Sequence, residues 1–455
     1  MLRYYCLIPD ISGKRVLAIP AGEGSWTLPA FEQDRDWFAW ASPEVARNAS
    51  EHYGITMTAL REHGEADCRL CELEIQAQQW APPAGTRWVE LGDLAVTEPA
   101  ALSSVLRAWF AEQESGEIPK LRPPWERRGW FEEAASWILS ECARLGCAPS
   151  GAVEQVKAAW SLSCILRINT SAGTLYFKAD FAKPPSEPGI IEALARRWPC
   201  NVPSVVAADH QRGWMLMRDF GQRWLEREPI ASWLTANRTL SAIQLACSTD
   251  LEPWWRLGCP DFRIPALIAH MDRLLTDPAA LRIGEPGGLT EAEAGRLRQL
   301  TPRLRDMLGE LTEIPIPASI VQQDFRLDNI VMSGRSYVFY DWSDTVIGHP
   351  FFSCCRFLDY IQYAPHPGRS LSLEEQKRRV GEAYLEPWTG ILGRTDLKRA
   401  FKLARQLGPV YVAIRRYLDA PWCESTSSWG RTLREGPAIE LRRLLAVTEV
   451  MAQTR

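Results

Sequence analysis

One pattern constrains the fold of this chain more than any other feature. It is an apolar run, a short polar loop and a second apolar run that ends in an acid. The first run leads into Asp324, Asn329 follows five positions later, and the second run ends at Asp341. Side chains at the ends of adjacent strands would converge on one point, and their oxygens suit Mg²⁺. Phosphoryl transfer needs positioning and cations more than covalent help. The spacing therefore predicts that Asp324 orients the attacking hydroxyl or accepts its proton, while Asn329 and Asp341 hold Mg²⁺.

These motifs resemble those of the aminoglycoside phosphotransferase and choline kinase-like family, within the protein-kinase-like fold. The family loop reads H-G-D-x-x-x-x-N, and the form Asp-Phe-Arg-Leu-Asp-Asn found at 324–329 is often seen in it. The second family element is I-D-W or V-D-W followed by G-x-P, and this chain has Tyr-Asp-Trp at 340–342 and Gly-His-Pro at 348–350. The resemblance covers residues 151–455. It implies an ATP- and Mg²⁺-dependent enzyme that phosphorylates an alcohol group of a small molecule.

The resemblance extends to residues before the loop. Lys178 stands on a predicted strand, where the family lysine contacts the α- and β-phosphates of ATP. Glu187 opens the next predicted helix and would pair with Lys178, with Glu192 as the alternative partner. Backbone from Met217 to Asp219 would bind the adenine edge.

Two features of this region differ from the usual kinase motifs. Asp-Phe-Gly at 219–221 spells the kinase metal motif, but it comes before the catalytic loop, so the metal role is assigned to Asp341. The turn expected to cover the phosphates, at 158–163, contains no glycine. Backbone amides or the hydroxyls of Ser161 and Ser163 would cap the phosphates there, less closely than glycines allow.

Substitutions near the loop keep a second interpretation open. The family's loop histidine and glycine are Gln322 and Gln323 here, and the aspartate that follows G-x-P is Ser353. In kinases that histidine and that aspartate brace the loop and do no chemistry. The alternative is therefore a catalytically silent module that binds a nucleotide or a partner. A protein kinase ranks last, because no activation segment or A-P-E sequence separates Asp341 from Pro350.

Residues 1–97 resemble a Nudix hydrolase fold in which the metal-binding box has decayed. Aligned on Gly54, the chain keeps Arg47, Glu51 and Ile55. The box glycine and three of its glutamates are replaced, in order, by Gln33, Ala39, Asn48 and His52. A Nudix site holds its divalent cations with those carboxylates. We therefore expect no hydrolase activity from this region, and the plainer alternative is a small α/β module.

The predicted architecture is α+β, with a two-lobed kinase-like domain after a small α/β domain. The expected parts are a degenerate Nudix-like domain at 1–97, a helical, Trp-rich connector at 98–150 in which Trp125 docks, an N-lobe at 151–222 and a mainly helical C-lobe at 223–455. Apolar patterns predict strands at 2–8, 15–19, 69–75, 87–91, 165–169, 174–181, 205–208 and 214–218, and helices at 42–53, 101–113, 130–144 and 187–197. Beyond 223, strands are expected only within 319–331 and 337–341.

Bulk composition limits the partners. The net charge is −4 and the pI is near 6.0, which disfavours nucleic acid as the main partner. No run approaches the ~20 apolar residues that span a bilayer, so we expect a cytoplasmic protein without a membrane partner. Twelve cysteines are expected to be mostly small buried residues. Cys68 and Cys71 have no second pair at zinc-finger spacing and are not expected to bind metal.

Overall fold

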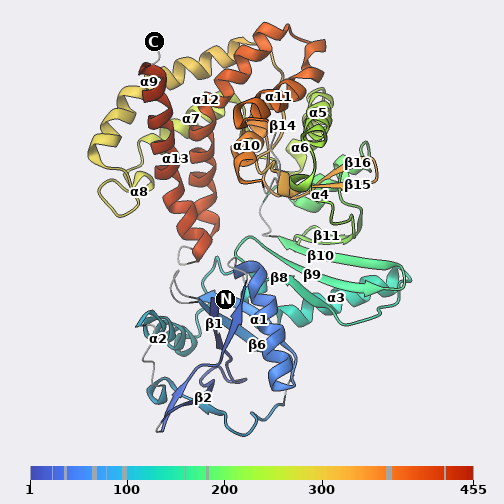
Figure 1. Cartoon of the computed structure of the whole chain (residues 1–455), viewed down its shortest axis with the longest axis vertical. Helices are drawn as coiled ribbons and strands as arrows, with labels where there is room; N and C mark the ends of the chain where they lie inside the picture. Colours follow the sequence, from blue (N-terminus) through green and yellow to red (C-terminus); the bar gives the residue numbers. More distant parts are fainter. Residues whose placement is uncertain are drawn as a thin grey trace. The chain divides into compact units, whose positions relative to one another are not determined.

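The computed structural model of the chain describes residues 2–22, 24–34, 38–63, 69–77, 79–94, 100–158, 160–180, 184–364, 371–424 and 427–453. Helices and sheets occur throughout, so the predicted α+β class is confirmed (Figure 1). Internal contacts divide the chain into two compact units. The first comprises 1–181, 214–217 and 422–431, and the second comprises 182–213, 218–421 and 432–455.

The first unit contains a mixed sheet whose strands follow the order β4-β1-β6-β5. These strands are β1 (Leu2–Leu7), β4 (Ala30–Gln33), β5 (Met57–His63) and β6 (Arg69–Ile75). β1 runs parallel to β6, and the other pairs are antiparallel. Helix α1 (Phe38–Tyr53) joins β4 to β5 and packs against both through small apolar residues such as Ala41 and Val45. Because β4 and β5 lie at opposite edges of the sheet, this connection crosses the sheet from one edge to the other.

A second core in this unit gathers segments that are far apart in the sequence. Strands β3 (Ser25–Thr27), β2 (Val16–Gly22) and β7 (Arg87–Val89) form a small sheet. Helix α2 (Ala100–Ser115) buries Leu106 and Trp109 in the same cluster as Leu7, Val16 and Val89. The predicted connector therefore contributes α2 to the core of the first strands.

Trp125 docks as expected, because it is 3% exposed and its Nε1 donates to the carbonyl of Trp160 at 2.7 Å. It lies in the 3₁₀ turn η2 (Pro124–Glu126), just before helix α3 (Trp130–Arg144). Contacts between aromatic rings link Trp125 to Trp130, Trp130 to Phe177, and Phe177 to Trp214. This cluster fixes the helix against the strands described next.

Strands β12 (Trp214–Arg218), β10 (Gly173–Asp180), β9 (Ser163–Thr170) and β8 (Glu154–Lys157) follow one another in one sheet. β9 and β10 form the predicted hairpin, in which Lys178 lies opposite Ile165. The end of the predicted strand at residue 181 lies outside the described residues.

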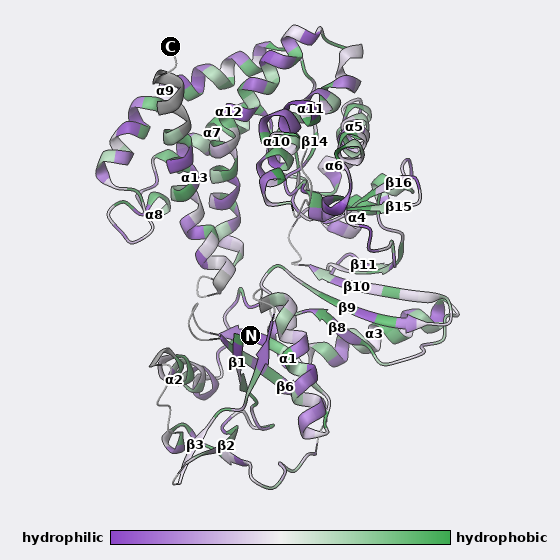
Figure 2. Cartoon of the chain, in the orientation of Figure 1, coloured by the Kyte–Doolittle hydropathy of each residue, from purple (hydrophilic) through white to green (hydrophobic). Residues whose placement is uncertain are grey.

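The second unit is mainly helical, as predicted. It begins with α4 (Glu187–Ala195), β11 (Val205–Asp209), η3 (Leu225–Arg227), α5 (Ile230–Cys247), α6 (Glu252–Arg256), α7 (Ile264–Leu275), α8 (Pro278–Leu281) and α9 (Glu291–Glu313). It continues with α10 (Phe351–Tyr360), η5 (Ile361–Tyr363), α11 (Leu373–Leu385), η6 (Glu386–Gly390), α12 (Arg394–Asp419) and α13 (Ser428–Gln453). Figure 2 shows both hydrophilic and hydrophobic colours along α9, whose buried leucines recur at helical spacing. None of the described helices is both long and apolar enough to cross a membrane.

Short strands in this unit carry the predicted loop. β13 (Asp261–Phe262), β17 (Thr345–Gly348) and β14 (Ser319–Gln322) form one sheet, and β15 (Ile330–Ser333) and β16 (Ser336–Phe339) form a hairpin. The predicted stretch 319–331 is thus two strands separated by a turn, and β13 and β17 were not expected. Gly348 is needed at the end of β17, because a Cβ there would lie 2.9 Å from the carbonyl oxygen of Phe262.

Candidate functional site

Three residues predicted from the sequence lie together in the second unit. Asp324 follows β14, and Asn329 ends the 3₁₀ turn η4 (Leu327–Asn329) immediately before β15. The β15–β16 hairpin returns the chain, so that the backbone N–H of Tyr340 donates to the carbonyl of Asn329 at 3.2 Å. Asp341 is the next residue. The loop and the acid at the end of the hairpin are therefore neighbours.

The Asn329 side chain is tied to Asp324. Its Nδ2 donates to the backbone carbonyl of Asp324 at 2.9 Å and to the carboxylate Oδ2 at 3.0 Å. Both partners only accept hydrogen bonds, so the NH₂ end of the amide must face them. The amide oxygen Oδ1 of Asn329 therefore points away from these bonds and is the end of the side chain suited to a cation.

Asp341 has an unusual backbone conformation. Its φ is +62°, and among the described residues only Arg282 shares a positive φ without being glycine. Such a conformation costs about 1–3 kcal/mol and persists where surrounding bonds impose it. Here Nε2 of Gln322 donates to the carbonyl of Tyr340 at 2.8 Å and to that of Asp341 at 3.3 Å. Gln322, which stands where the family has histidine, thus braces the Asp341 segment.

Ser353, the second substitution, also belongs to a bracing network. Nε2 of Gln244 donates to Oγ of Ser353 at 3.1 Å and to the carbonyl of Ile320 at 2.8 Å. The hydroxyl of Tyr384 donates to Oε1 of Gln244 and lies 2.7 Å from the carbonyl of Pro350. Helices α5, α10 and α11 are thereby bound to β14, directly before Asp324. The strand that leads into the loop is thus held by amide and hydroxyl groups.

Of the two acids considered as partners of Lys178, Glu187 lies next to the Asp341 segment. Its Oε1 accepts a hydrogen bond from the backbone N–H of Trp342 at 2.9 Å. Glu192 instead lies 3.3 Å from Nε2 of His210. Lys178 itself belongs to β10 of the first unit. Its pairing with Glu187 stays a prediction.

Of the other residues predicted to contact the nucleotide, Ser161, Ser163 and Met217 belong to the first unit and Asp219 belongs to the second. Oγ of Ser163 lies 3.1 Å from Nζ of Lys157, and Ser161 lines a hollow of about 290 Å³. Met217 is the last residue of the first unit on β12. Asp219 closes a turn, because its Oδ1 accepts from the N–H of Gly221 at 2.8 Å. The phosphate and adenine roles of these residues stay predictions.

Three arginines surround Asp324, and sequence reasoning gave no role to any of them. Nε of Arg326 lies 3.4 Å from Oδ2, a terminal nitrogen of Arg356 lies 3.5 Å from Oδ1, and Nη1 of Arg415 lies 3.9 Å from Oδ1. Arg326 and Arg356 also lie over the ring of Tyr360, at 4.9 and 4.5 Å from its centroid. Arg326 could have been noticed inside the loop motif. Arg356 and Arg415 come from α10 and α12, and no local pattern marks them.

The positive charge extends one residue further. Burial lowers the pKa of Arg416, the nearby Glu440 carboxylate raises it, and the guanidinium groups of Arg356 and Arg415 lower it again, so that the net shift is downward. Arg415 is held by the carboxylate of Asp344 and donates to the carbonyl of Gln323 at 3.1 Å. Asp324 therefore faces a wall of guanidinium groups, here called the cationic wall, whose charge is largely balanced by Asp328, Asp344, Asp419 and Glu440.

Metal-binding clusters of the usual protein-only kind are not found. No group of three or more His, Cys, Asp and Glu side chains among the described residues could hold a metal ion. Cys71 is buried on β6, whereas Cys68 lies outside the described part of the chain.

A scan against protein-family models finds no match, and a search of curated proteins finds none either. The similar solved structures include choline and ethanolamine kinases and aminoglycoside phosphotransferases. A choline/ethanolamine kinase family protein from Mesorhizobium loti is 13% identical, with a TM-score of 0.47, over 70% of this chain and 95% of that one. An ethanolamine kinase from Plasmodium vivax is 10% identical, with a TM-score of 0.45, over 73% and 94%.

A spectinomycin phosphotransferase solved with ADP and spectinomycin is 8% identical, with a TM-score of 0.42, over 68% of this chain and 96% of that one. At these identities and TM-scores, the likeness by itself assigns neither a family nor an activity to this chain.

Proposed function

We propose that residues 151–455 form a kinase-like phosphotransferase of the aminoglycoside phosphotransferase and choline kinase type, which transfers phosphate from ATP to a hydroxyl group of a small molecule. The observation that carries this proposal is the Asn329 amide tied to Asp324 beside the strained backbone of Asp341. Backbone strain held by specific bonds is typical of functional sites.

Each residue of the site has one task in this proposal. Asp324 orients the acceptor hydroxyl and takes its proton as the bond to phosphorus forms. Lys178 contacts the α- and β-phosphates and is positioned by Glu187. Backbone and hydroxyl groups at Ser161 and Ser163 cap the phosphates, and Met217 to Asp219 bind the adenine edge.

Magnesium fits the oxygen atoms that this site offers. The hydrogen bonds of Asn329 direct its Oδ1 away from Asp324, and Asp341 supplies a carboxylate. Mg²⁺ commonly takes one or two protein oxygens and completes its shell with phosphate oxygens and water. Asn329 and Asp341 would therefore hold Mg²⁺ together with the nucleotide, where the ion neutralises charge on the phosphates.

The cationic wall narrows the class of acceptor. Arg326, Arg356 and Arg415 lie within 4 Å of Asp324, and Arg416 adds a fourth guanidinium nearby. The guanidinium groups of these arginines can form bidentate pairs with a carboxylate or phosphate group of an acceptor. We therefore propose a hydroxyl acceptor that also carries an anionic group.

Arg356→Gln tests this acceptor class. The variant is expected to raise the KM for an anionic acceptor about tenfold, which corresponds to ~1.4 kcal/mol, and to leave the KM for ATP unchanged. The paired substrates are a hydroxy acid and the amino alcohol of the same carbon skeleton, with ADP release as the readout. Arg399→Gln on the exposed side of α12 serves as the matched control. Preference for the amino alcohol would exclude the anionic class.

Calorimetry of Mg-ATP binding tests the phosphotransferase itself. The wild type is expected to bind ATP more tightly with Mg²⁺ than without it, and Asp341→Ala is expected to lose the Mg²⁺-dependent part. Asp324→Asn is expected to keep Mg-ATP binding and to lose ADP release with an acceptor. Absence of any nucleotide binding by the wild type would refute the proposal.

A catalytically silent nucleotide- or partner-binding module is the second candidate. It is favoured by the phosphate-covering turn without glycine, where Ser163 is already engaged by Lys157. This candidate predicts Mg-ATP binding without ADP release across a panel of alcohols. ADP release by the wild type in the presence of an acceptor therefore separates the two candidates.

For the first 97 residues we propose a Nudix-like fold without hydrolase activity. In support, a mixed sheet carries α1, and Gln33, Ala39, Asn48 and His52 replace the first glycine and three of the four glutamates of the box. Incubation with nucleoside diphosphate derivatives and Mg²⁺ is expected to give no hydrolysis. We also propose the domain borders drawn at 97, 150 and 222 and a cytoplasmic location.

A further inference from the structure

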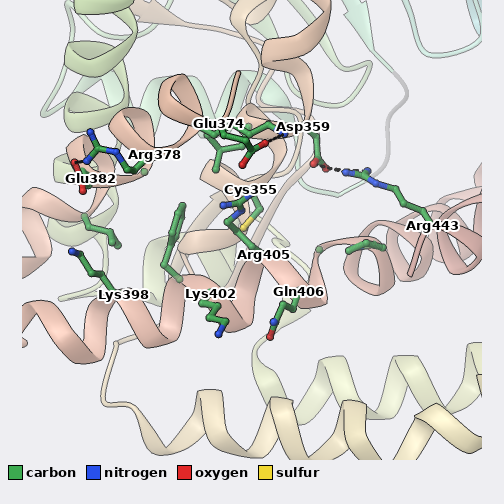
Figure 3. A pocket seen from close by; sticks show the side chains of 17 residues that line it. Cys355, Asp359, Glu374, Arg378, Glu382, Lys398, Lys402, Arg405, Gln406 and Arg443 are labelled. Atoms are coloured by element: carbon green, nitrogen blue, oxygen red, sulfur yellow. Dashed lines mark hydrogen bonds and ion pairs between the residues drawn. The ribbon is translucent and has the colours of Figure 1, made fainter. Parts of the chain in front are cut away.

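A hollow of about 810 Å³ lies among α10, α11 and α12, with Arg443 of α13 also lining it (Figure 3). Part of its lining is apolar and well packed, because Cys355, Leu358, Leu385 and Phe401 are each less than a tenth exposed. Gly381 permits this arrangement, since a Cβ there would come within 2.7 Å of the Phe401 ring. The volume falls in the range of ~300–1,000 Å³ that is typical of small-molecule sites.

The acids that line this hollow are neutralised within it. Each of them is paired with a cation that also lines the hollow: Glu374 with Lys377 at 3.3 Å, Glu382 with Arg378 at 2.7 Å, and Asp359 with Arg443 at 2.5 Å. Two of these pairs, Glu382–Arg378 and Asp359–Arg443, are among the dashed lines of Figure 3. None of the three acids is left to balance further positive charge.

Three further cations line the hollow from α12. Lys398, Lys402 and Arg405 are spaced by four and three residues, so they share one face of the helix. Within the described part of the chain, none of them makes a hydrogen bond or an ion pair. Arg399 on the same helix, by contrast, donates to Glu310 at 2.6 Å. Six cations against three acids leave the lining with a net charge of +3.

We propose that this hollow binds a small organic phosphate, with the phosphate on the α12 cations and the apolar part against Leu358, Leu385 and Phe401. Exposed lysines are commonly just solvated, but here three unpaired cations border a hollow with an apolar floor. Several cations on one face suit a multiply charged group better than a single carboxylate. The hollow and the surroundings of Asp324 share none of the described residues. Arg356 and Arg415 contact Asp324, whereas Cys355 of α10 and Arg405 of α12 line the hollow.

Calorimetry on the full chain with hexyl phosphate tests the inference. We expect one bound hexyl phosphate per chain, and at least about tenfold weaker binding of 1-hexanol and of inorganic phosphate. The triple variant K398Q/K402Q/R405Q is expected to lose at least about tenfold in affinity. The control R399Q, on the same helix but outside the hollow, is expected to bind as the wild type does.

Several results would overturn the inference: no binding to the wild type, unchanged binding to the triple variant, or equal affinity for inorganic phosphate, which would mean an adventitious ion only. Co-sedimentation with anionic vesicles in place of hexyl phosphate binding would point to a lipid surface and would also refute a soluble ligand. Mg-ATP binding of the triple variant, measured in parallel, is expected to be unchanged. Failure here is thereby distinguished from failure of the phosphotransferase proposal.

Discussion

At the scale of single residues, the backbone conformation of Asp341 lowers the stability of the fold. A positive φ costs a residue with a Cβ about 1–2 kcal/mol, which glycine avoids. We expect Asp341→Gly to raise the free energy of unfolding by about 1 kcal/mol and to abolish Mg²⁺-dependent ATP binding. Asp341→Ala removes the same carboxylate but keeps the strain, so it should lose binding without the gain in stability. Urea unfolding and calorimetry compare the two variants, and equal stabilities would show that Asp341 is not strained.

The residues that could be predicted at this scale are those with a local spacing. Asp324 and Asn329 lie in one short loop, and a single hairpin separates them from Asp341. The sequence spacing alone therefore predicts that the three side chains lie close together. Arg356 and Arg415 escaped prediction, because they reach Asp324 only through the packing of α10 and α12. The spacing of a loop is visible in a sequence, whereas a contact between helices depends on the whole fold.

At the scale of elements, we expect the stability provided by the bracing network to depend on the hydroxyl group of Tyr384. Tyr384 is fully buried, and its hydroxyl serves both Gln244 and the carbonyl of Pro350. Tyr384→Phe leaves the buried Oε1 of Gln244 without its donor, whereas the carbonyl of Pro350 still accepts from the N–H of Ser353 at 3.1 Å, so we expect a loss of about 1–3 kcal/mol in the free energy of unfolding. Tyr363→Phe is the control, because Tyr363 is 72% exposed. A loss of the same size in both variants would show that the buried hydrogen bonds of Tyr384 contribute no extra stability.

Elements with a clear apolar period were predictable, and short buried strands were not. Strand β6 and helix α3 have the predicted bounds, and the β9–β10 hairpin extends the prediction by a few residues. Strand β17 was missed because Thr345–Gly348 is buried along its whole length and shows no alternation. Only its partners β13 and β14 make these four residues a strand.

At the scale of the whole molecule, one buried acid couples stability to pH. Burial raises the pKa of Glu126 to about 8, against an ordinary value of 4.5, although Arg61 and Arg122 act in the opposite direction. The folded chain then binds a proton that the unfolded chain has lost between these two pH values. Since stability rises with pH only where the unfolded state binds more protons, the contribution of Glu126 to stability must fall as the pH rises from about 4.5 to about 8.

Glu126→Gln removes this titration. The difference in stability between the variant and the wild type should therefore depend on pH. At pH 4.5 the variant and the wild type should unfold at similar temperatures, because the carboxyl is largely neutral in the folded chain. Above pH 8 the variant should be more stable by on the order of 4–5 kcal/mol, given 1.36 kcal/mol per unit of pKa shift. Thermal unfolding across this range checks the prediction, with the exposed Glu117→Gln as control. A difference between variant and wild type that stays constant from pH 4.5 to 8.5 would mean that Glu126 is ionised in the folded protein.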